Sequence, residues 1–156
     1  MASTITAATM TVKITESISL NGKDQGAINS FTIPSVATIS KRIIDVPASE
    51  VEIIAMSSSA VSSGTFIESD VKYIRITNLD DANHVTLLFK NENDNEFAVK
   101  LDKGQSFIYN GDLTGGVVDT MDAATETLSV SFGDLVNITA QADTAACDIV
   151  MFVAST

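Results

Sequence analysis

The sequence contains no tryptophan, one cysteine, one histidine and two prolines among its 156 residues. A single cysteine, Cys147, excludes a disulfide within the chain. A single histidine restricts Ser/His/Asp and Cys/His catalytic arrangements to those that use His84 as the base. The absence of tryptophan disfavours a sugar-binding surface, because sugar-binding β-sandwiches present aromatic platforms.

Positive charge is also scarce. Nine Lys and Arg residues oppose twenty Asp and Glu residues, which leaves a net charge of −11, and no basic residue follows Lys103. A nucleic-acid-binding protein needs a basic face to neutralise phosphates, and an anionic membrane surface would repel this chain. We therefore expect no nucleic acid and no membrane among its partners.

Long apolar runs are missing as well. No stretch approaches the ~20 apolar residues that a membrane-spanning helix needs, and residues 1–9 lack the features of a signal peptide. We expect the protein to be made in a reducing host cytoplasm. We also expect residues 1–9 to form a flexible arm and residues 10–156 to form a single sandwich domain.

The residues that are abundant favour β-structure. Hydrophobic residues make up 45% of the chain, and there are seventeen serines and seventeen threonines. Thr, Val and Ile are typical of strands. Charged residues account for only 19%, below the roughly 25% of an average soluble domain. This low charge favours a surface that partly faces another subunit.

The hydrophobic pattern repeats every two residues, as in half-buried strands. Met10, Val12 and Ile14 alternate with polar residues, and Asn21–Asp24 is a turn signal. Further strands are predicted at about 27–33, 36–46, 51–56, 65–67, 71–77, 84–90, 96–101, 105–109, 127–132, 135–142 and 147–154. A helix is credible only in Asp119–Glu126. The pattern predicts an all-β, antiparallel β-sandwich of about ten strands, jelly-roll-like or Ig-like.

The four strands between Val71 and Tyr109 are separated by short polar turns. We expect them to form an antiparallel meander or hairpin stack, because such short connections join neighbouring antiparallel strands.

Few residues are candidates for chemistry. His84 begins a strand, and Cys147 lies in an apolar strand, where a buried thiol is the ordinary state. The Asn91–Glu96 turn and the Asp112–Asp122 loop hold several oxygen ligands of the kind calcium prefers, although turns rich in Asp and Asn also occur without metal. Asp80 is interpreted as a turn residue that bonds the local backbone. We predict no catalytic, cofactor-binding or metal-binding residues, and no enzymatic activity.

Residues 71–111 carry three sequence motifs, Ile74-Arg75-Ile76-Thr77-Asn78-Leu79-Asp80, Phe97-x-Val99-Lys100-Leu101 and Gly104-x-Ser106-Phe107. This segment resembles a module in small structural proteins of tailed bacteriophages. The resemblance implies a virion protein and supplies no catalytic residues. The expected role is a capsid decoration (cement) protein on the head surface, a homotrimer bound to the major capsid protein. The alternatives are a tail or neck component of the same virion, or a carbohydrate-binding sandwich for host attachment.

Overall fold

The computed structural model describes residues 5–122, 127–128 and 131–156. These residues form strands and connecting loops, and they include no helix, hence none long and apolar enough to cross a membrane. The strands are β1 (Ala8–Glu16), β2 (Ser19–Leu20), β3 (Lys23–Asp24), β4 (Ala27–Val36), β5 (Thr38–Val46), β6 (Val51–Ser57), β7 (Thr65–Ile67), β8 (Val71–Asn78), β9 (Val85–Asn91), β10 (Glu96–Leu101), β11 (Ser106–Asn110), β12 (Met121–Asp122), β13 (Phe132–Gly133), β14 (Leu135–Ala142) and β15 (Cys147–Ser155).

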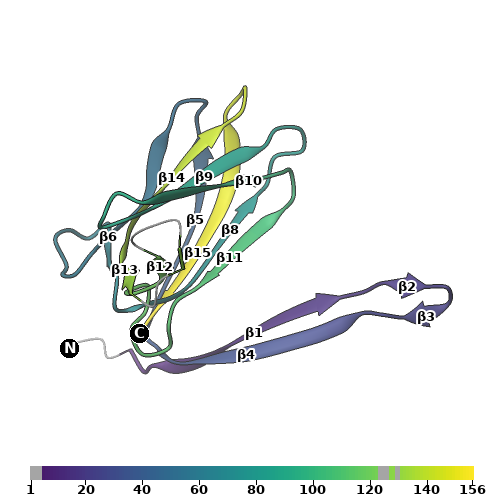
Figure 1. The fold of residues 1–156 in the computed structure, drawn as a ribbon, viewed down its shortest axis with the longest axis horizontal. Helices are drawn as coiled ribbons and strands as arrows, with labels where there is room; N and C mark the ends of the chain where they lie inside the picture. The colour runs from purple at the N-terminus through teal and green to yellow at the C-terminus, as the bar shows by residue number, and fades with distance from the viewer. Residues whose placement is uncertain (1–4, 123–126, 129–130) are drawn as a thin grey trace.

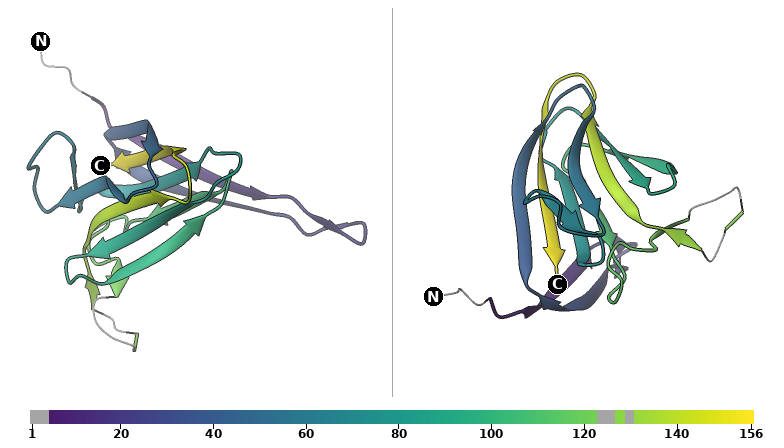
Figure 2. Two further views of the ribbon diagram at one scale, coloured as in Figure 1. Left: turned by 90° about the horizontal axis from the view of Figure 1, so that it is seen from above. Right: turned by 90° about the vertical axis from the view of Figure 1, so that its left-hand side faces the viewer.

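Two sheets face each other across the core (Figures 1 and 2). One has the strand order β10-β9-β14-β6-β7 and the other the order β11-β8-β15-β5. Every ladder in them is antiparallel except the short parallel pair β6–β7. The predicted all-β antiparallel sandwich is confirmed.

The pairing of eight strands defines the topology. Taken in chain order from β5 onward, without β7, β12 and β13, the first strand pairs with the last, β15, and the second, β6, pairs with the seventh, β14. The third, β8, pairs with β11, and the fourth, β9, pairs with β10. This nested pairing of eight strands in two sheets is a jelly roll. Of the two sandwich types expected from the sequence, the structure has the jelly-roll type.

The predicted meander or hairpin stack between Val71 and Tyr109 is wrong as a whole, since only β9 and β10 form a hairpin there. The chain passes from one sheet to the other after β8 and returns after β10, so β8 and β11 share one sheet while β9 and β10 share the other. The buried Asn78 side chain ties the two crossovers together, since its Nδ2 donates to Asn83 O at 2.9 Å and to Leu101 O at 3.1 Å. A short polar connection can span the roughly 10 Å between packed sheets as readily as it can close a hairpin.

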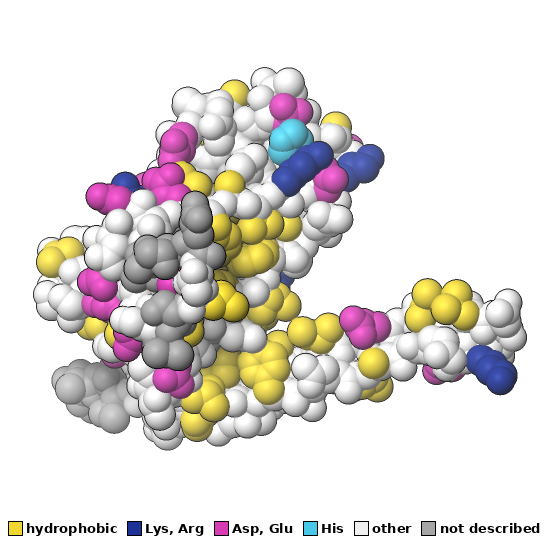
Figure 3. All heavy atoms as spheres, viewed as in Figure 1, with side chains coloured by type: hydrophobic (Ala, Val, Ile, Leu, Met, Phe, Trp, Pro, Cys, Tyr) yellow, Lys and Arg dark blue, Asp and Glu magenta, His cyan; other side chains and the backbone are white. Residues whose placement is uncertain are grey.

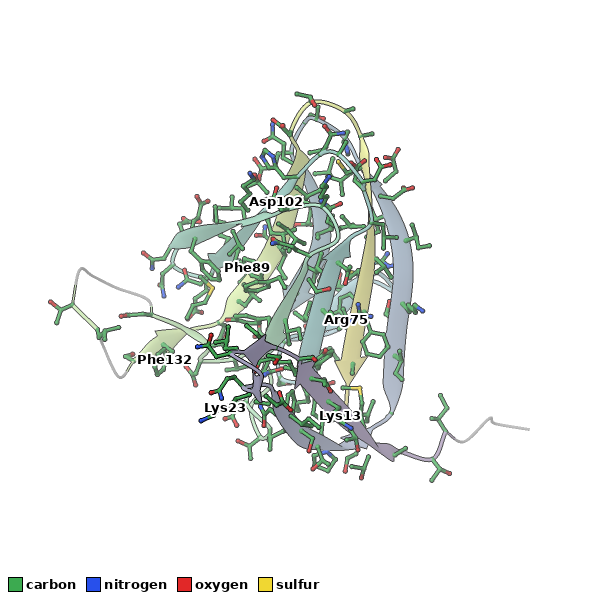
Figure 4. All side chains as sticks on the ribbon, turned by 90° about the vertical axis from the view of Figure 1, so that its right-hand side faces the viewer. Lys13, Lys23, Arg75, Phe89, Asp102 and Phe132 are labelled. Atoms are coloured by element: carbon green, nitrogen blue, oxygen red, sulfur yellow. The ribbon has the colours of Figure 1, made fainter. Side chains whose placement is uncertain are left out.

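The core contains apolar side chains from the inner faces of both sheets. Phe89 is the largest fully buried residue. Its ring stacks on that of Phe97, with 4.6 Å between the ring centroids. The centroids of the Phe107 and Tyr109 rings lie 5.0 and 5.6 Å from that of Phe89. Figure 4 shows Phe89 between the two sheets. This aromatic cluster closes the sandwich between its edge strands β10 and β11.

Residues 8–36 form a long hairpin outside both sheets, which we term the arm (Figure 1). Strands β1 and β4 pair along its length, and β2 and β3 continue it to the tip. The expected sandwich began at residue 10, whereas the two sheets begin with β5 at Thr38. The expected flexible arm of residues 1–9 lies partly outside the described residues, and Ala8 already belongs to β1. Pro34, which falls between the predicted strands 27–33 and 36–46, lies within β4.

Two further local predictions fall on the segment before β14. A helix was expected at Asp119–Glu126, but Met121–Asp122 forms strand β12. Residues 123–126 of the expected helix lie outside the described part of the chain. The expected strand 127–132 also includes residues outside it. Within the described residues the strand there is β13, which pairs with β12.

Candidate assembly surface

One side of the arm carries most of its apolar residues, together with Glu16 and Lys23. The same register holds from Met10 opposite Ile33 to Leu20 opposite Lys23, across the short interruption between the two strand pairs, so alternate residues point to the same side. We call the apolar residues on this side the arm stripe: Met10, Val12, Ile14, Ile18, Leu20, Phe31 and Ile33. The tip turn has positive φ at Asn21 (52°) and Gly22 (74°), the backbone that a type I′ hairpin turn requires.

The inner half of the arm stripe packs on the sandwich. Ile33 and Val36 are buried with Tyr73 and Ala154, and Met10, Val12, Phe31, Ile108 and Phe152 pack around them. The Tyr73 ring lies 6.5 Å from that of Phe31 and 6.1 Å from that of Phe152. The root of the arm is therefore anchored on the outer face of the β11-β8-β15-β5 sheet.

The outer half of the arm stripe has no such cover. Ile18 and Leu20 are 50% and 55% exposed, and Ile14 is also exposed. Figure 3 shows hydrophobic side chains on the side of the arm that faces the body. Apolar side chains aligned on one side of an extended element are typical of a surface that another protein covers.

A second exposed apolar row lies on the edge strand β5. Ile39 and Ile43 are 58% and 69% exposed. They lie opposite Ala154 and Val150 of β15, which places them on the same outer face as the arm root. Strand β5 ends its sheet, so the backbone along its other side has no strand partner among the described residues. Such an edge can accept a strand from another molecule.

Charge divides sharply between the two parts of the molecule. Residues 1–37 hold two lysines and two acidic residues, so the other seven basic and eighteen acidic residues, with the full net charge of −11, lie on residues 38–156. Lys13 and Lys23 of the arm and Arg75 of the body are labelled in Figure 4. Two bodies would repel each other, whereas a neutral arm approaches an acidic body without that cost.

The structure brings the two catalytic candidates together without forming a catalytic pair. His84 Nδ1 lies 3.5 Å from Asp143 Oδ2. The Cys147 thiol faces the backbone instead, with Sγ 3.5 Å from Ala145 O and 4.0 Å from His84 O. Burial, and then the nearby carboxylates, raise the pKa of Cys147. A nucleophilic cysteine requires the opposite shift.

We expect iodoacetamide at pH 8 to alkylate Cys147 at least about a hundredfold more slowly in the folded protein than in urea, because the reaction must wait for opening. Mass spectrometry of quenched time points measures both rates. His84→Ala serves as the control and should leave the folded rate low. Fast alkylation of the native protein would show that the thiol is accessible and activated.

The Asn91–Glu96 turn uses its oxygen atoms internally. Asn91 Oδ1 accepts from the backbone N–H groups of Asn93 and Asn95, at 3.0 and 2.9 Å. Lys90 Nζ lies 2.9 Å from Asp94 and 3.8 Å from Glu96. A lysine at the position that a cation would occupy argues against calcium in this turn.

The Asp112–Asp122 loop is held by its own polar contacts. The Asp112 carboxylate accepts from both N and Oγ1 of Thr114, and buried Lys72 donates to Thr114 O at 3.1 Å. Asp80 Oδ1 accepts from the N–H groups of Ala82 and Asn83, which confirms its predicted turn role. Over the described part of the chain, no group of three His, Cys, Asp or Glu side chains could hold a metal ion.

The sequence analysis did not identify the arm as a surface. Its alternating pattern correctly indicated strands, but the same pattern is expected for a hairpin inside the sandwich. The apolar strand Cys147–Ala154 is central in its sheet, paired with β5 and β8, as its almost continuous apolar sequence indicates. The available signal was the alternation of apolar residues on both sides of the Asn21-Gly22 turn, which is typical of a long hairpin.

Comparison with known proteins places the chain in no family. No family model matches it, and no curated protein matches it. One similar solved structure is described by the words "Bacillus endospore appendages form a novel family of disulfide-linked pili". The match covers 100% of this chain and 96% of that chain, with 10% sequence identity and a TM-score of 0.42. A similarity this low supports no conclusion about function.

Proposed function

We propose that this protein is a structural subunit that associates with copies of itself through its arm. The observation that carries the proposal is the uncovered outer half of the arm stripe, Ile14, Ile18 and Leu20. Burying a fully exposed Ile or Leu side chain contributes roughly 1.5–3 kcal/mol, and these three, which are 36–55% exposed, gain a part of that when they are covered. A hairpin that projects an apolar face into water is more stable when a neighbour covers it.

We further propose that the assembly is a virion, and that the protein is a decoration or cement protein on the head of a tailed bacteriophage. The resemblance of residues 71–111 to small phage structural proteins supports this part. The expected partners are the major capsid protein and two further copies of this chain in a homotrimer. A cement protein works by burying modest areas on several capsid subunits at once, so that the summed contacts hold the shell. Neither catalysis nor nucleic-acid binding belongs to this proposal.

Light scattering of the purified protein tests self-association. We expect an oligomer at tens of micromolar, and we expect Ile18→Lys to weaken its association at least about tenfold, because it places a charge in an apolar contact. Ile28→Lys is the matched control. Ile28 is 65% exposed and lies opposite Thr15 on the other side of the arm. A wild-type protein that stays a 16.5 kDa monomer at these concentrations would contradict the proposal.

Purified particles test the virion assignment. Mass spectrometry with copy counting should find hundreds of copies per particle for a head protein, whereas a tail or neck component would be present in only a few. Particles that lack the protein should lose DNA at a lower temperature and under milder osmotic shock. Equal survival of both kinds of particle would remove the cement role.

A further inference from the structure

The arm stripe and the exposed face of β5 carry matching patterns. On the arm, Ile14, Glu16 and Ile18 are two residues apart and point to one side, so that the acid lies between two isoleucines. On β5, Ile39, Lys41 and Ile43 point to the outer face of the sheet, with a base in the middle. Both rows repeat every two residues, and their central charges are opposite.

We infer that strand β1 of one copy pairs with the edge strand β5 of a second copy, so that the arm extends the β11-β8-β15-β5 sheet of its neighbour. This inference rests on the proposed self-association and names the surface that performs it. The outer edges of β5 and of the two-stranded β1–β4 sheet both lack strand partners among the described residues. Strand addition satisfies those backbone groups with hydrogen bonds, and side chains decide the register.

The side-chain pattern selects a register in which Glu16 of one copy lies opposite Lys41 of the other. In this register the flanking isoleucines of the two strands meet in either strand direction, because both rows are symmetric about their central charge. The apolar residues of the arm then continue the outer face formed by Val150 and Phe152 beside β5. This face already holds the root of each protein's own arm, so the new contact would be continuous with an existing apolar contact.

Charge identifies a second copy as the occupant. Lys41 interrupts an exposed apolar row on the body, which carries a net charge of −11 on residues 38–156, and the arm presents Glu16 at the matching place. Lys41 also protects the free edge, because a charged side chain on an edge strand disfavours pairing with arbitrary strands. A strand that brings a carboxylate to Lys41 is accepted where an uncharged or basic strand is not.

A charge exchange tests the inference in the full-length protein. We expect Glu16→Lys and Lys41→Glu each to weaken self-association about tenfold at low salt, and the double variant to restore it. An equimolar mixture of the two single variants should associate more tightly than either alone, since each junction between unlike copies then carries opposite charges. At 1 M salt the differences should largely vanish, because charges are screened beyond about 3 Å.

Lys13→Glu is the matched control. It changes the charge of the same strand but points to the other side of the arm, and it should leave association unchanged. Single variants that associate like wild type would overturn the strand pairing, and so would a mixture that gains nothing. If Ile18→Lys still abolishes association in that case, self-association through the arm stands and only the acceptor site is wrong. A monomeric wild-type protein would instead remove the proposed function itself.

Discussion

Phe89→Ala is expected to lower the free energy of unfolding by about 3–5 kcal/mol, the usual cost of removing a buried phenylalanine. Phe89 is fully buried in strand β9 and contacts three other rings, those of Phe97, Phe107 and Tyr109. With Phe89 itself, these rings come from three strands, β9, β10 and β11, of both sheets. The cavity would therefore loosen the closure of the sandwich between β10 and β11 as well as lose apolar burial.

Chemical denaturation followed by circular dichroism measures this change. Phe132→Ala is the matched control, because Phe132 is exposed in β13 (Figure 4) and its truncation should cost less than about 1 kcal/mol. Similar losses for the two variants would mean that the aromatic cluster around Phe89 is not the tightly packed centre of the fold.

Gly116→Ala is expected to cost about 2–4 kcal/mol, which combines backbone strain with a steric clash. Gly116 has φ = 72°, a conformation that costs an L-residue about 1–2 kcal/mol. An added Cβ would also overlap the backbone carbonyl oxygens of Glu68 and Ser69. These oxygens belong to the chain just before β8, so neither can move as a flexible side chain would.

Gly104→Ala is the matched control and measures the backbone strain without the clash. Gly104 has a similar φ of 69°, but an added Cβ there would meet no atom within 4 Å. This control should cost only the backbone strain, and the difference between the two variants in thermal or urea denaturation reports the clash. Equal costs would indicate that the Asp112–Asp122 loop adjusts freely around Gly116.

Local residue patterns were sufficient to predict most strands. Alternation in Met10–Ile14 and the apolar run Leu135–Ala142 predict strands because half-buried and buried strands need those side chains wherever they lie. Asn21-Gly22 predicts the tip turn because few other residues accept positive φ. Asp80 bonds its own turn, so its role is also readable from neighbouring residues.

The choice of partner strand was not readable in this way. The connection after Asn78 is short and polar, and such a segment fits both a hairpin and a crossover between sheets. The difference is decided by the complete set of ladders, in which β15, more than sixty residues later, pairs with β8. The sequence analysis therefore predicted the meander from the local connections alone.

The sequence by itself determined that the chain is all-β, that it is acidic, and that it holds a single His and a single Cys. Only the tertiary structure decided which apolar faces are covered. Ile14 and Ile74 both lie in strands with alternating apolar residues, yet Ile74 is buried between the sheets while Ile14 is exposed on the arm. A strand's period of two requires that one face be apolar, but burial depends on which elements pack against that face, and those elements lie far away along the chain.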